Sequence, residues 1–283
     1  MATTDIYHIV GSLSPSRPAA KFIAKADEAC LIDEFAEARV VAADTAGTFT
    51  AWVNLPDITG DYGIVSCGDT AAIEFITLRV TAGKLVGECN DGTTDQWEHT
   101  STNVVITPHK WHHVAIAQGA DLEAPRLYVD GERIAQTATL ATDNGTWFAD
   151  CDLIDDGSIG AAEEAGAAAQ IRECKGAISD VKYWNVQLTD EEVQQDYEGK
   201  DPTTIRKTAG TSNLTDWWKM KDLTNSVTAA NPIVKGASII FQNQYSEFSS
   251  RFHFTPAAAA VVADKVLISV KDDAGHAIII KAA

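Results

Sequence analysis

The feature that most constrains the fold of this chain is a series of short runs in which apolar and polar residues alternate. Such runs are typical of half-buried strands. TAGK, NDGT and VDGE, which separate several of them, contain Gly or Asn and are typical of hairpin turns. The runs lie at 49–55, 62–68, 73–80, 84–89, 103–107, 112–118, 126–137 and 177–185. Because strand follows strand without a helical crossover, the sequence predicts an all-β protein, an antiparallel β-sandwich of the jelly-roll type.

Two short helices are expected among the strands. In LTDEEVQQDYEG, at 188–199, Thr189 is placed to cap the helix and Glu192 follows three residues later, which together make a capping box. Gly199 then ends the helix. A second short helix is predicted over DEFAEARVV, at 33–41.

The pattern changes after about residue 200. A linker-like stretch at 201–213 precedes LTDWWKM, at 214–220, which is predicted to be a strand. The segments 236–244 and 250–254 and a hairpin over 265–281, with DDAG as its turn, complete the tail. The tail is expected to be either a β-rich extension of the preceding domain or a small second module.

Charge and hydropathy exclude several classes of partner. The chain of 283 residues has 40 acidic against 22 basic side chains, a net charge of −18. Nucleic-acid binders need clustered Lys and Arg, so neither nucleic acid nor an anionic membrane is an expected partner. The longest apolar runs are too short to cross a bilayer, and the first residues lack the pattern of a secretory signal. The chain is therefore expected to be made in a cytoplasm.

Five cysteines, at 30, 67, 89, 151 and 174, show no spacing typical of metal ligands. An odd number scattered through predicted strands indicates free, partly buried thiols. Cys67 and Cys89 lie on predicted neighbouring strands and could face each other.

Three segments resemble the laminin-G-like, or concanavalin-A-like, jelly-roll family. WHHVA followed by LYVDG, at 111–131, is similar to two successive strands of that family. FTAWVNLP, at 49–56, resembles an earlier strand, and 176–199 resembles the closing strand and short helix. The resemblance covers about 19–200 and implies a sandwich there, with an N-terminal arm at 1–18 and an extension at 201–283. This fold carries many functions, so the resemblance specifies little about function.

The adjacent histidines His112 and His113 are not expected to form a site. Successive residues of a strand point to opposite faces, so two imidazoles in sequence cannot converge on one metal ion. Trp111 and His113 are expected to share one face, and one imidazole is expected to point outward.

Carbohydrate recognition is typically made by an aromatic platform flanked by polar groups. Trp97 and Trp147 lie in polar, loop-like surroundings and are the candidate exposed platforms. Trp52, Trp111 and Trp184 lie in strands that match core positions of the family, and are expected to pack.

The resemblance also implies calcium as a candidate ligand, because members of this fold often bind it through loop carboxylates at the sandwich rim. The candidate loops are 90–95 and 150–157, and the candidate ligands are Asp91, Asp95, Asp152, Asp155 and Asp156. Neither loop has EF-hand spacing, and acidic turn residues in an acidic protein are the alternative interpretation. Asp130, in YVDG, is predicted to form a turn.

No catalytic motif is recognised, and Glu74 in AIEFITL is a weak candidate for a catalytic carboxylate. The sequence therefore favours a non-enzymatic structural or interaction protein, and specifically a bacteriophage virion component such as a capsid decoration protein or fibre. Such a protein would be a homo-oligomer or would bind capsid or tail proteins, with glycan as a further ligand. The alternative is an extracellular or cell-surface carbohydrate-binding module or adhesin, calcium-dependent or not, assisting a glycoside hydrolase.

Overall fold

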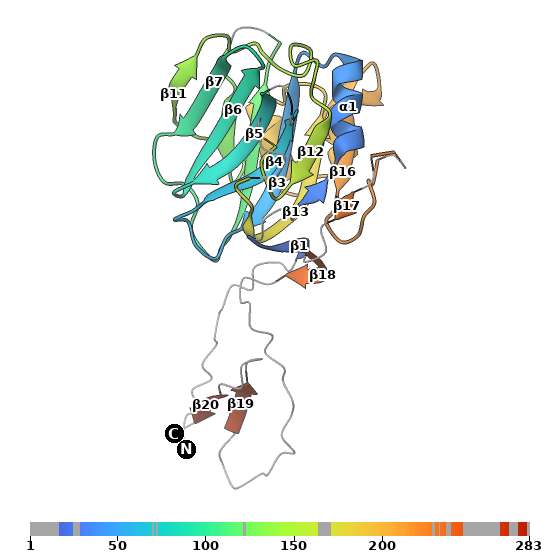
Figure 1. The fold of residues 1–283 in the computed structure, drawn as a ribbon. Coiled ribbons are helices and arrows are strands. Elements are labelled where there is room, and N and C mark those ends of the chain that lie inside the picture. Colours follow the sequence, from blue (N-terminus) through green and yellow to red (C-terminus); the bar gives the residue numbers. More distant parts are fainter. Residues whose placement is uncertain are drawn as a thin grey trace.

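The protein is a sandwich of two antiparallel β-sheets packed face to face, as the computed structural model shows (Figure 1). The structure describes residues 17–24, 29–69, 71, 73–120, 123–163, 171–227, 230–231, 233–235, 239–245, 267–271 and 277–281. The predicted all-β sandwich is confirmed. Most of the predicted N-terminal arm and the segment 250–254 lie outside the described residues.

The first sheet has the strand order β10-β9-β8-β3-β13-β1-β18, and β16 pairs with β13 beside β1. Its strands are β1 (Arg17–Ile23), β3 (Gly47–Asn54), β8 (Trp111–Gln118), β9 (Arg126–Val129), β10 (Glu132–Arg133), β13 (Lys175–Trp184), β16 (Leu214–Trp218) and β18 (Ile240–Tyr245).

The second sheet has the order β11-β7-β6-β5-β4-β12-β2-β17. Its strands are β2 (Cys30–Leu31), β4 (Asp61–Gly68), β5 (Glu74–Thr81), β6 (Lys84–Asp91), β7 (Asp95–Ser101), β11 (Gln136–Ala141), β12 (Asp156–Ile159) and β17 (Val234–Lys235). Two further pairs are β14 (Lys207–Thr208) with β15 (Thr211–Ser212), and β19 (Leu267–Lys271) with β20 (Ala277–Lys281).

Both predicted helices are present. α1 spans Asp33–Ala42, and α2 spans Asp190–Tyr197 with the full capping box between Thr189 and Glu192. A single-turn helix, α3 (Pro202–Ile205), follows α2 in the stretch predicted to be a linker. Asp201 caps this turn by accepting a hydrogen bond from the Thr203 amide, 3.0 Å away, and Pro202 occupies its first position.

One predicted strand is wrong, and several strands were not predicted, among them β7, β12 and the short pair β14–β15. Residues 103–107 form a loop in which the amides of Val105 and Ile106 both donate to the carbonyl of Gly83, so the segment covers the β5–β6 turn. β7 lies in a stretch that was predicted to be a loop. Trp97 is the single large apolar side chain of this strand, so its sequence lacks the alternation that identifies a strand.

The inter-sheet core is rich in aromatic residues. Phe35, from α1, makes edge-to-face contacts with Phe49, Phe148, Tyr183 and Trp218, with ring centroids 5.1–6.2 Å apart. Such contacts stabilise beyond the area that they bury. They fix α1 against the edge of the sandwich.

α2 covers the outward face of the first sheet. Outward residues of β8, β9 and β13 pack with Leu188 and Val193 in a second apolar cluster. Tyr197 stacks on Trp52 with centroids 5.6 Å apart. The expectation that Trp52, Trp111 and Trp184 pack is therefore confirmed, although they pack beneath the helices, outside the inter-sheet core.

The turn between β9 and β10 explains how α2 can approach so closely. Asp130 and Gly131 both have positive φ, 52° and 83°, as a type I′ hairpin requires. A Cβ on Gly131 would lie 2.5 Å from Oε1 of Gln194 and 2.9 Å from Cβ of Tyr197. Glycine is thus needed both for the turn and for the helix that lies on it, and the prediction that Asp130 forms a turn is confirmed.

The five cysteine side chains are buried, more completely than the sequence predicted. Cys67 and Cys89 are not direct neighbours, because Ile76 of β5 lies between them in the sheet. The nearer sulfur to Cys89 is that of Cys151, with 4.0 Å between the Sγ atoms. Burial raises the pKa of the Cys67 and Cys89 thiols well above the usual value. In the described part of the chain, no helix has the length and apolar character needed to span a membrane.

Candidate functional site

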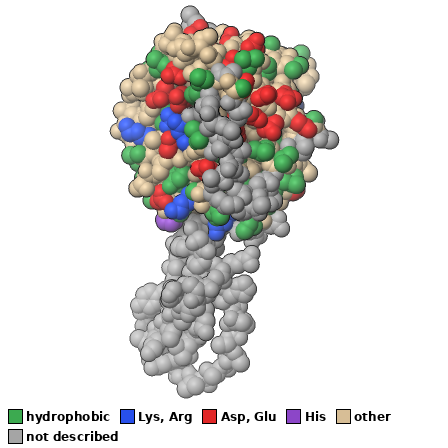
Figure 2. All heavy atoms as spheres, viewed as in Figure 1, with side chains coloured by type: hydrophobic (Ala, Val, Ile, Leu, Met, Phe, Trp, Pro, Cys, Tyr) green, Lys and Arg blue, Asp and Glu red, His purple; other side chains and the backbone are tan. Residues whose placement is uncertain are grey.

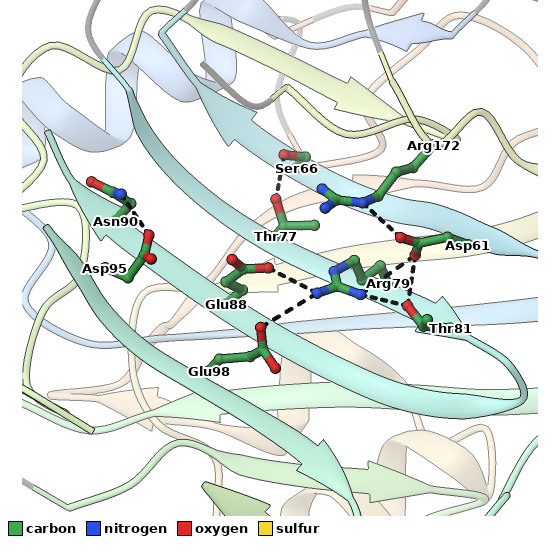
Figure 3. Close-up of polar contacts among 10 residues, drawn as sticks. All are labelled: Asp61, Ser66, Thr77, Arg79, Thr81, Glu88, Asn90, Asp95, Glu98 and Arg172. Atoms are coloured by element: carbon green, nitrogen blue, oxygen red, sulfur yellow. Dashed lines mark hydrogen bonds and ion pairs between the residues drawn. The ribbon is translucent and has the colours of Figure 1, made fainter. Parts of the chain in front are cut away.

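The outward face of β4–β7 carries polar side chains that form one network around Arg79 and two separate pairs (Figure 3). The first sheet has its outward face packed under α2. This face instead carries polar groups from four adjacent strands, some of them buried, since Ser66 and Thr77 are 1% exposed and Asn90 is 6% exposed. Side chains of alternate residues share a face of a strand, and the register places Thr77 and Arg79 of β5 beside Glu88 of β6 and Glu98 of β7.

Arg79 is at the centre of this polar face. Its Nη2 lies 2.9 Å from Oε2 of Glu88 and 3.6 Å from Oε2 of Glu98. Its Nη1 donates to the hydroxyl of Thr81 and lies 3.4 Å from Oδ1 of Asp61. The Arg79 side chain is only 9% exposed. A guanidinium at this depth must be paired with carboxylates, and three carboxylates surround it.

A second arginine extends the network. Nε of Arg172, from the segment after β12, donates to Oδ2 of Asp61 over 2.7 Å. Oδ1 of the same carboxylate accepts from the Thr81 hydroxyl at 2.6 Å. Asp61 therefore bridges two guanidinium groups and a hydroxyl, while its side chain stays 34% exposed.

Two smaller polar pairs flank the charged centre. The hydroxyls of Ser66 and Thr77 lie 2.8 Å apart on β4 and β5, and the Ser66 hydroxyl also accepts from the amide of Glu163 at 3.0 Å. On the other side, Nδ2 of Asn90 donates to Oδ1 of Asp95 over 2.7 Å. These bonds hold each polar side chain in one orientation.

Asp91 and Asp95, two of the candidate calcium ligands, form local turn contacts. Oδ1 of Asp91 accepts from the Thr93 hydroxyl and from the amides of Thr93 and Thr94, at 2.7–3.1 Å. Burial raises the pKa of Asp91, but these hydrogen bonds outweigh it and lower the pKa to about 2. Asp91 thus caps its turn, in agreement with the alternative interpretation of the acidic loops.

The other candidate ligands lie near the start of β12. The Asp155 amide donates to the carbonyl of Gly68, and Asp156 begins β12 opposite that glycine. Asp152 lies near Glu74, whose carboxylate accepts from the amide of Leu153 at 2.7 Å. Burial raises the pKa of Glu74. Among the described residues, no three acidic, histidine or cysteine side chains are grouped so that they could hold a metal ion.

The predicted exposure of Trp97 and Trp147 is wrong. Both indoles are 0% exposed. They stack on each other in the core with ring centroids 6.3 Å apart and an interplanar angle of 15°. Within the core, Nε1 of Trp97 donates to the carbonyl of Thr146, and Nε1 of Trp147 donates to the hydroxyl of Tyr183. Polar neighbours in the sequence suggested loops, but Trp97 is the inward residue of a strand and its neighbours point elsewhere.

The two adjacent histidines point to opposite faces, as predicted, but neither points into solvent. His112 is held between the Thr107 amide and Oδ2 of Asp130, at 3.0 and 2.9 Å. His113 is 0% exposed, and its Nε2 lies 3.1 Å from Oδ2 of Asp196 on α2. The prediction of an outward imidazole fails because α2 covers that face of the sheet.

A buried ion pair lies under α2. Nζ of Lys182, on β13, is 3.1 Å from Oδ1 of Asp196 and 2.6 Å from Oδ2 of Asp180. Burial disfavours the charged form of Asp196, but Lys182 and hydrogen bonds from His113 and Thr50 hold its pKa well below the usual value. Burial likewise lowers the pKa of Lys182, and the two aspartates raise it above normal. This ion pair attaches α2 to the first sheet. We therefore treat it as structural and not as part of the polar face of β4–β7.

The face of the molecule that carries β4–β7 is acidic. On the side of the molecule that carries β4–β7, Asp and Glu side chains gather in several groups, and fewer Lys and Arg side chains lie among them (Figure 2). The net charge of −18 agrees with this view.

Sequence reasoning missed the residues of the polar face. Thr77 and Arg79 alternate with apolar residues in the predicted strand 73–80, so their outward position was readable from the pattern. Their partners Glu88 and Glu98 were not, because their meeting depends on the register of β5, β6 and β7.

Comparison with known proteins agrees with the architecture. None of the curated proteins matches the chain. Among solved structures, the CBM40 module of Ruminococcus gnavus IT-sialidase superposes with a TM-score of 0.52 and 16% identity, over 64% of this chain and 97% of the module. The same module bound to α2,3-sialyllactose gives a TM-score of 0.50 and 16% identity, over 65% and 96%. The leech intramolecular trans-sialidase gives 0.52 and 20% identity, over 66% of this chain and 29% of the enzyme.

At these identities the structural likeness shows a shared fold. The family is shown by the sequence itself, since the model of the concanavalin A-like lectin/glucanases superfamily matches residues 34–194, more than half of the chain. That range runs from α1 through the polar strands β4–β7 to α2. The chain therefore belongs to the concanavalin A-like lectin/glucanase superfamily.

Proposed function

We propose that this protein binds glycans through the outward face of β4–β7, as a non-catalytic carbohydrate-binding module or adhesin. The observation that carries the proposal is the connected polar network around Arg79 on a sheet face that α2 does not cover. The likeness to a CBM40 module that has been seen with bound α2,3-sialyllactose supports glycan binding, while the choice of face rests on the geometry alone.

The chemistry of the face suits sugar hydroxyls. Sugars are recognised by planar groups that donate and accept hydrogen bonds in fixed directions, which carboxylates, amides and guanidinium groups supply. Here the Arg79 contacts lock Glu88 and Glu98, and the bond from Asn90 locks Asp95. A ligand that meets such a face has few side chains left to order, and preorganisation of this kind favours affinity.

Binding fits the geometry better than hydrolysis does. A glycosidase needs one carboxylic acid that can give a proton and one that can attack or activate water. Glu88 and Glu98 face each other across β6 and β7, but both contact the same guanidinium. They are therefore placed as hydrogen-bond acceptors for a ligand, and we assign no catalytic role to them.

Binding to a broad glycan array should be followed by titration of the best sugar against matched variants. Glu98→Ala is expected to weaken binding roughly 10- to 100-fold, because a hydrogen bond to a charged group is worth about 1.5–3 kcal/mol. Glu191→Ala, on the exposed start of α2, is the matched control and should bind as the unaltered protein does. Equal affinity of the two variants for the sugar would place the binding site elsewhere.

The same titration with calcium and then with EDTA tests the metal prediction. We expect the affinity to be unchanged by the chelator, because Asp91 and Asp95 already use carboxylate oxygens for contacts within their own turn. Loss of binding in EDTA, restored by added calcium, would instead support the loops at 90–95 and 150–157 as ligands.

A second role, in assembly, is favoured by β19 and β20. Within the described part of the chain these two strands pair only with each other. Their register matches Ile268 with Ile280 and Val270 with Ile278. A two-stranded sheet is marginally stable alone in water, so we propose that copies of this hairpin associate. A virion component such as a capsid decoration protein or fibre is one kind of assembly in which copies of a chain meet in this way.

Light scattering after size-exclusion chromatography measures this association. The protein should elute at a multiple of its 30.3 kDa mass. Ile278→Asp should shift it toward the single-chain mass, because a charge between apolar strands is costly to bury. The control Val104→Asp, at an exposed loop position, should leave the mass unchanged. A single-chain mass for the unaltered protein would contradict the assembly role and leave the glycan proposal untouched.

A further inference from the structure

We propose that the polar face selects neutral or amine-bearing glycans and rejects glycans that carry carboxylate or sulfate groups. This inference rests on the proposed function and narrows its ligand to a chemical class. Three features carry it: the balance of charge on the face, the engagement of its cations, and the exposure of its acceptors.

Acidic groups outnumber basic groups on this face. The register places Lys84 opposite Thr81, and Asp95 opposite Asn90, on the same side of the sheet as Arg79. The acidic side chains on or beside the face are Asp61, Glu88, Asp95 and Glu98, and the basic ones are Arg79, Lys84 and Arg172. An anionic sugar would therefore meet a face of its own sign.

The two arginines of the face are already paired with carboxylates, and Lys84 is hydrogen-bonded to a backbone carbonyl. Arg79 uses both terminal nitrogens on carboxylates and on Thr81, beneath a surface that leaves 9% of its side chain exposed. Nε of Arg172 is bonded to Asp61. Lys84 donates to the carbonyl of Thr102, 3.1 Å away. A sugar carboxylate could reach Arg79 only by displacing Glu88 or Glu98, which would leave another buried carboxylate without its partner.

The acceptors of the face are exposed at least as much as its arginines. The side chains of Asp61 and Glu98 are 34% and 27% exposed, against 24% for Arg172 and 9% for Arg79. A carboxylate accepts hydrogen bonds and has no proton to give while ionised. It pairs with a sugar hydroxyl as donor, and more strongly with an ammonium group, because a charge-assisted bond is about twice as strong as a neutral one.

The electrostatic field of the whole molecule also disfavours anionic sugars. A net charge of −18 repels anions and attracts cations before contact is made. Salt screens this part of the effect, since the Debye length falls from about 30 Å at 0.01 M to about 8 Å at 0.15 M. Discrimination that arises from charge is therefore expected to shrink as salt is added.

Calorimetric titration of the full chain with paired sugars tests the proposal. Lactose is paired with α2,3-sialyllactose, which adds a carboxylate, and chitohexaose is paired with its deacetylated form, which adds amines. We expect lactose to bind at least about tenfold tighter than sialyllactose at low salt, and the deacetylated oligomer to bind more tightly than chitohexaose. Binding of the amine-bearing oligomer should weaken as salt rises.

Glu98→Gln keeps the shape of the side chain and removes its charge. It should reduce the preference for amine over carboxylate several-fold, and Glu191→Gln, on α2, should not. Sialyllactose that binds as tightly as lactose, or tighter, would overturn the proposed ligand class and leave the glycan-binding function standing. Absence of binding to any sugar of a broad array would instead overturn the proposed function itself, and this inference with it.

Discussion

Asp196→Ala is expected to lower the free energy of unfolding by about 3–5 kcal/mol, because it leaves Lys182 buried without its main counterion. The lysine side chain is 2% exposed and the aspartate 1%. Thr50 and His113 would lose their acceptor too, at 2.8 and 3.1 Å. Urea denaturation followed by tryptophan fluorescence measures the change.

Glu191→Ala, on the exposed side of the same helix, is the control and should cost less than about 1 kcal/mol. A loss for Asp196→Ala as small as that of the control would mean that the pair contributes little and that α2 is held by its apolar contacts. Asp196→Asn, which keeps the shape, should fall between the two because it still accepts from Thr50.

The same carboxylate predicts how stability depends on pH. Its pKa is held below that of the unfolded chain, whose ordinary value is 3.8. A carboxyl group whose pKa is lower in the folded protein than in the unfolded chain stabilises the folded state at any pH above the unfolded pKa. That stabilisation is lost as the pH falls through the pKa of the folded protein. The unaltered protein should therefore lose stability below about pH 4, and Asp196→Asn should lose less over that range. Parallel pH curves for the two proteins would contradict this.

Trp97→Ala is expected to cost about 3–5 kcal/mol, as large-to-small substitutions of buried aromatic residues do. The ring is 0% exposed and stacks on Trp147, so its removal leaves a cavity between the sheets and an unpaired carbonyl at Thr146. Thermal unfolding by circular dichroism measures the loss, and Trp97→Phe should recover part of it.

Val104→Ala, at a residue that is 57% exposed, is the control and should be close to neutral. If Trp97 were an exposed aromatic platform, Trp97→Ala would instead keep normal stability and lose sugar binding. That result would contradict the burial of Trp97 that the structure shows.

Much of the fold was predictable because its signals are local. Alternation identified most of the long strands, and the Thr189–Glu192 capping box identified α2, since each depends on residues a few positions apart. The predictions that failed concerned features that depend on residues far apart in the sequence. Trp97 looks exposed beside Gln96 and Glu98, and its burial appears only when β7 is paired between β6 and β11.

The polar face was unpredictable for a related reason. Arg79 contacts residues from β4, β6 and β7, and a shift of one residue in any of these strands would turn its partners inward. The prediction of an outward histidine was wrong for the same reason. Nothing within WHHVA shows that α2, some 80 residues later in the chain, lies over His113.

The two sheets pair N-terminal strands with strands far along the chain, and this has a consequence for how the protein is made. β1 lies between β13 and β18, and β2 lies between β12 and β17. A ribosome releases β1 and β2 long before their neighbours exist. The first strands must wait, unpaired, for well over a hundred residues to be synthesised, and both sheets are complete only when β18 emerges. Closing such long loops is slow, so the N-terminal strands of the nascent chain should be a binding site for chaperones.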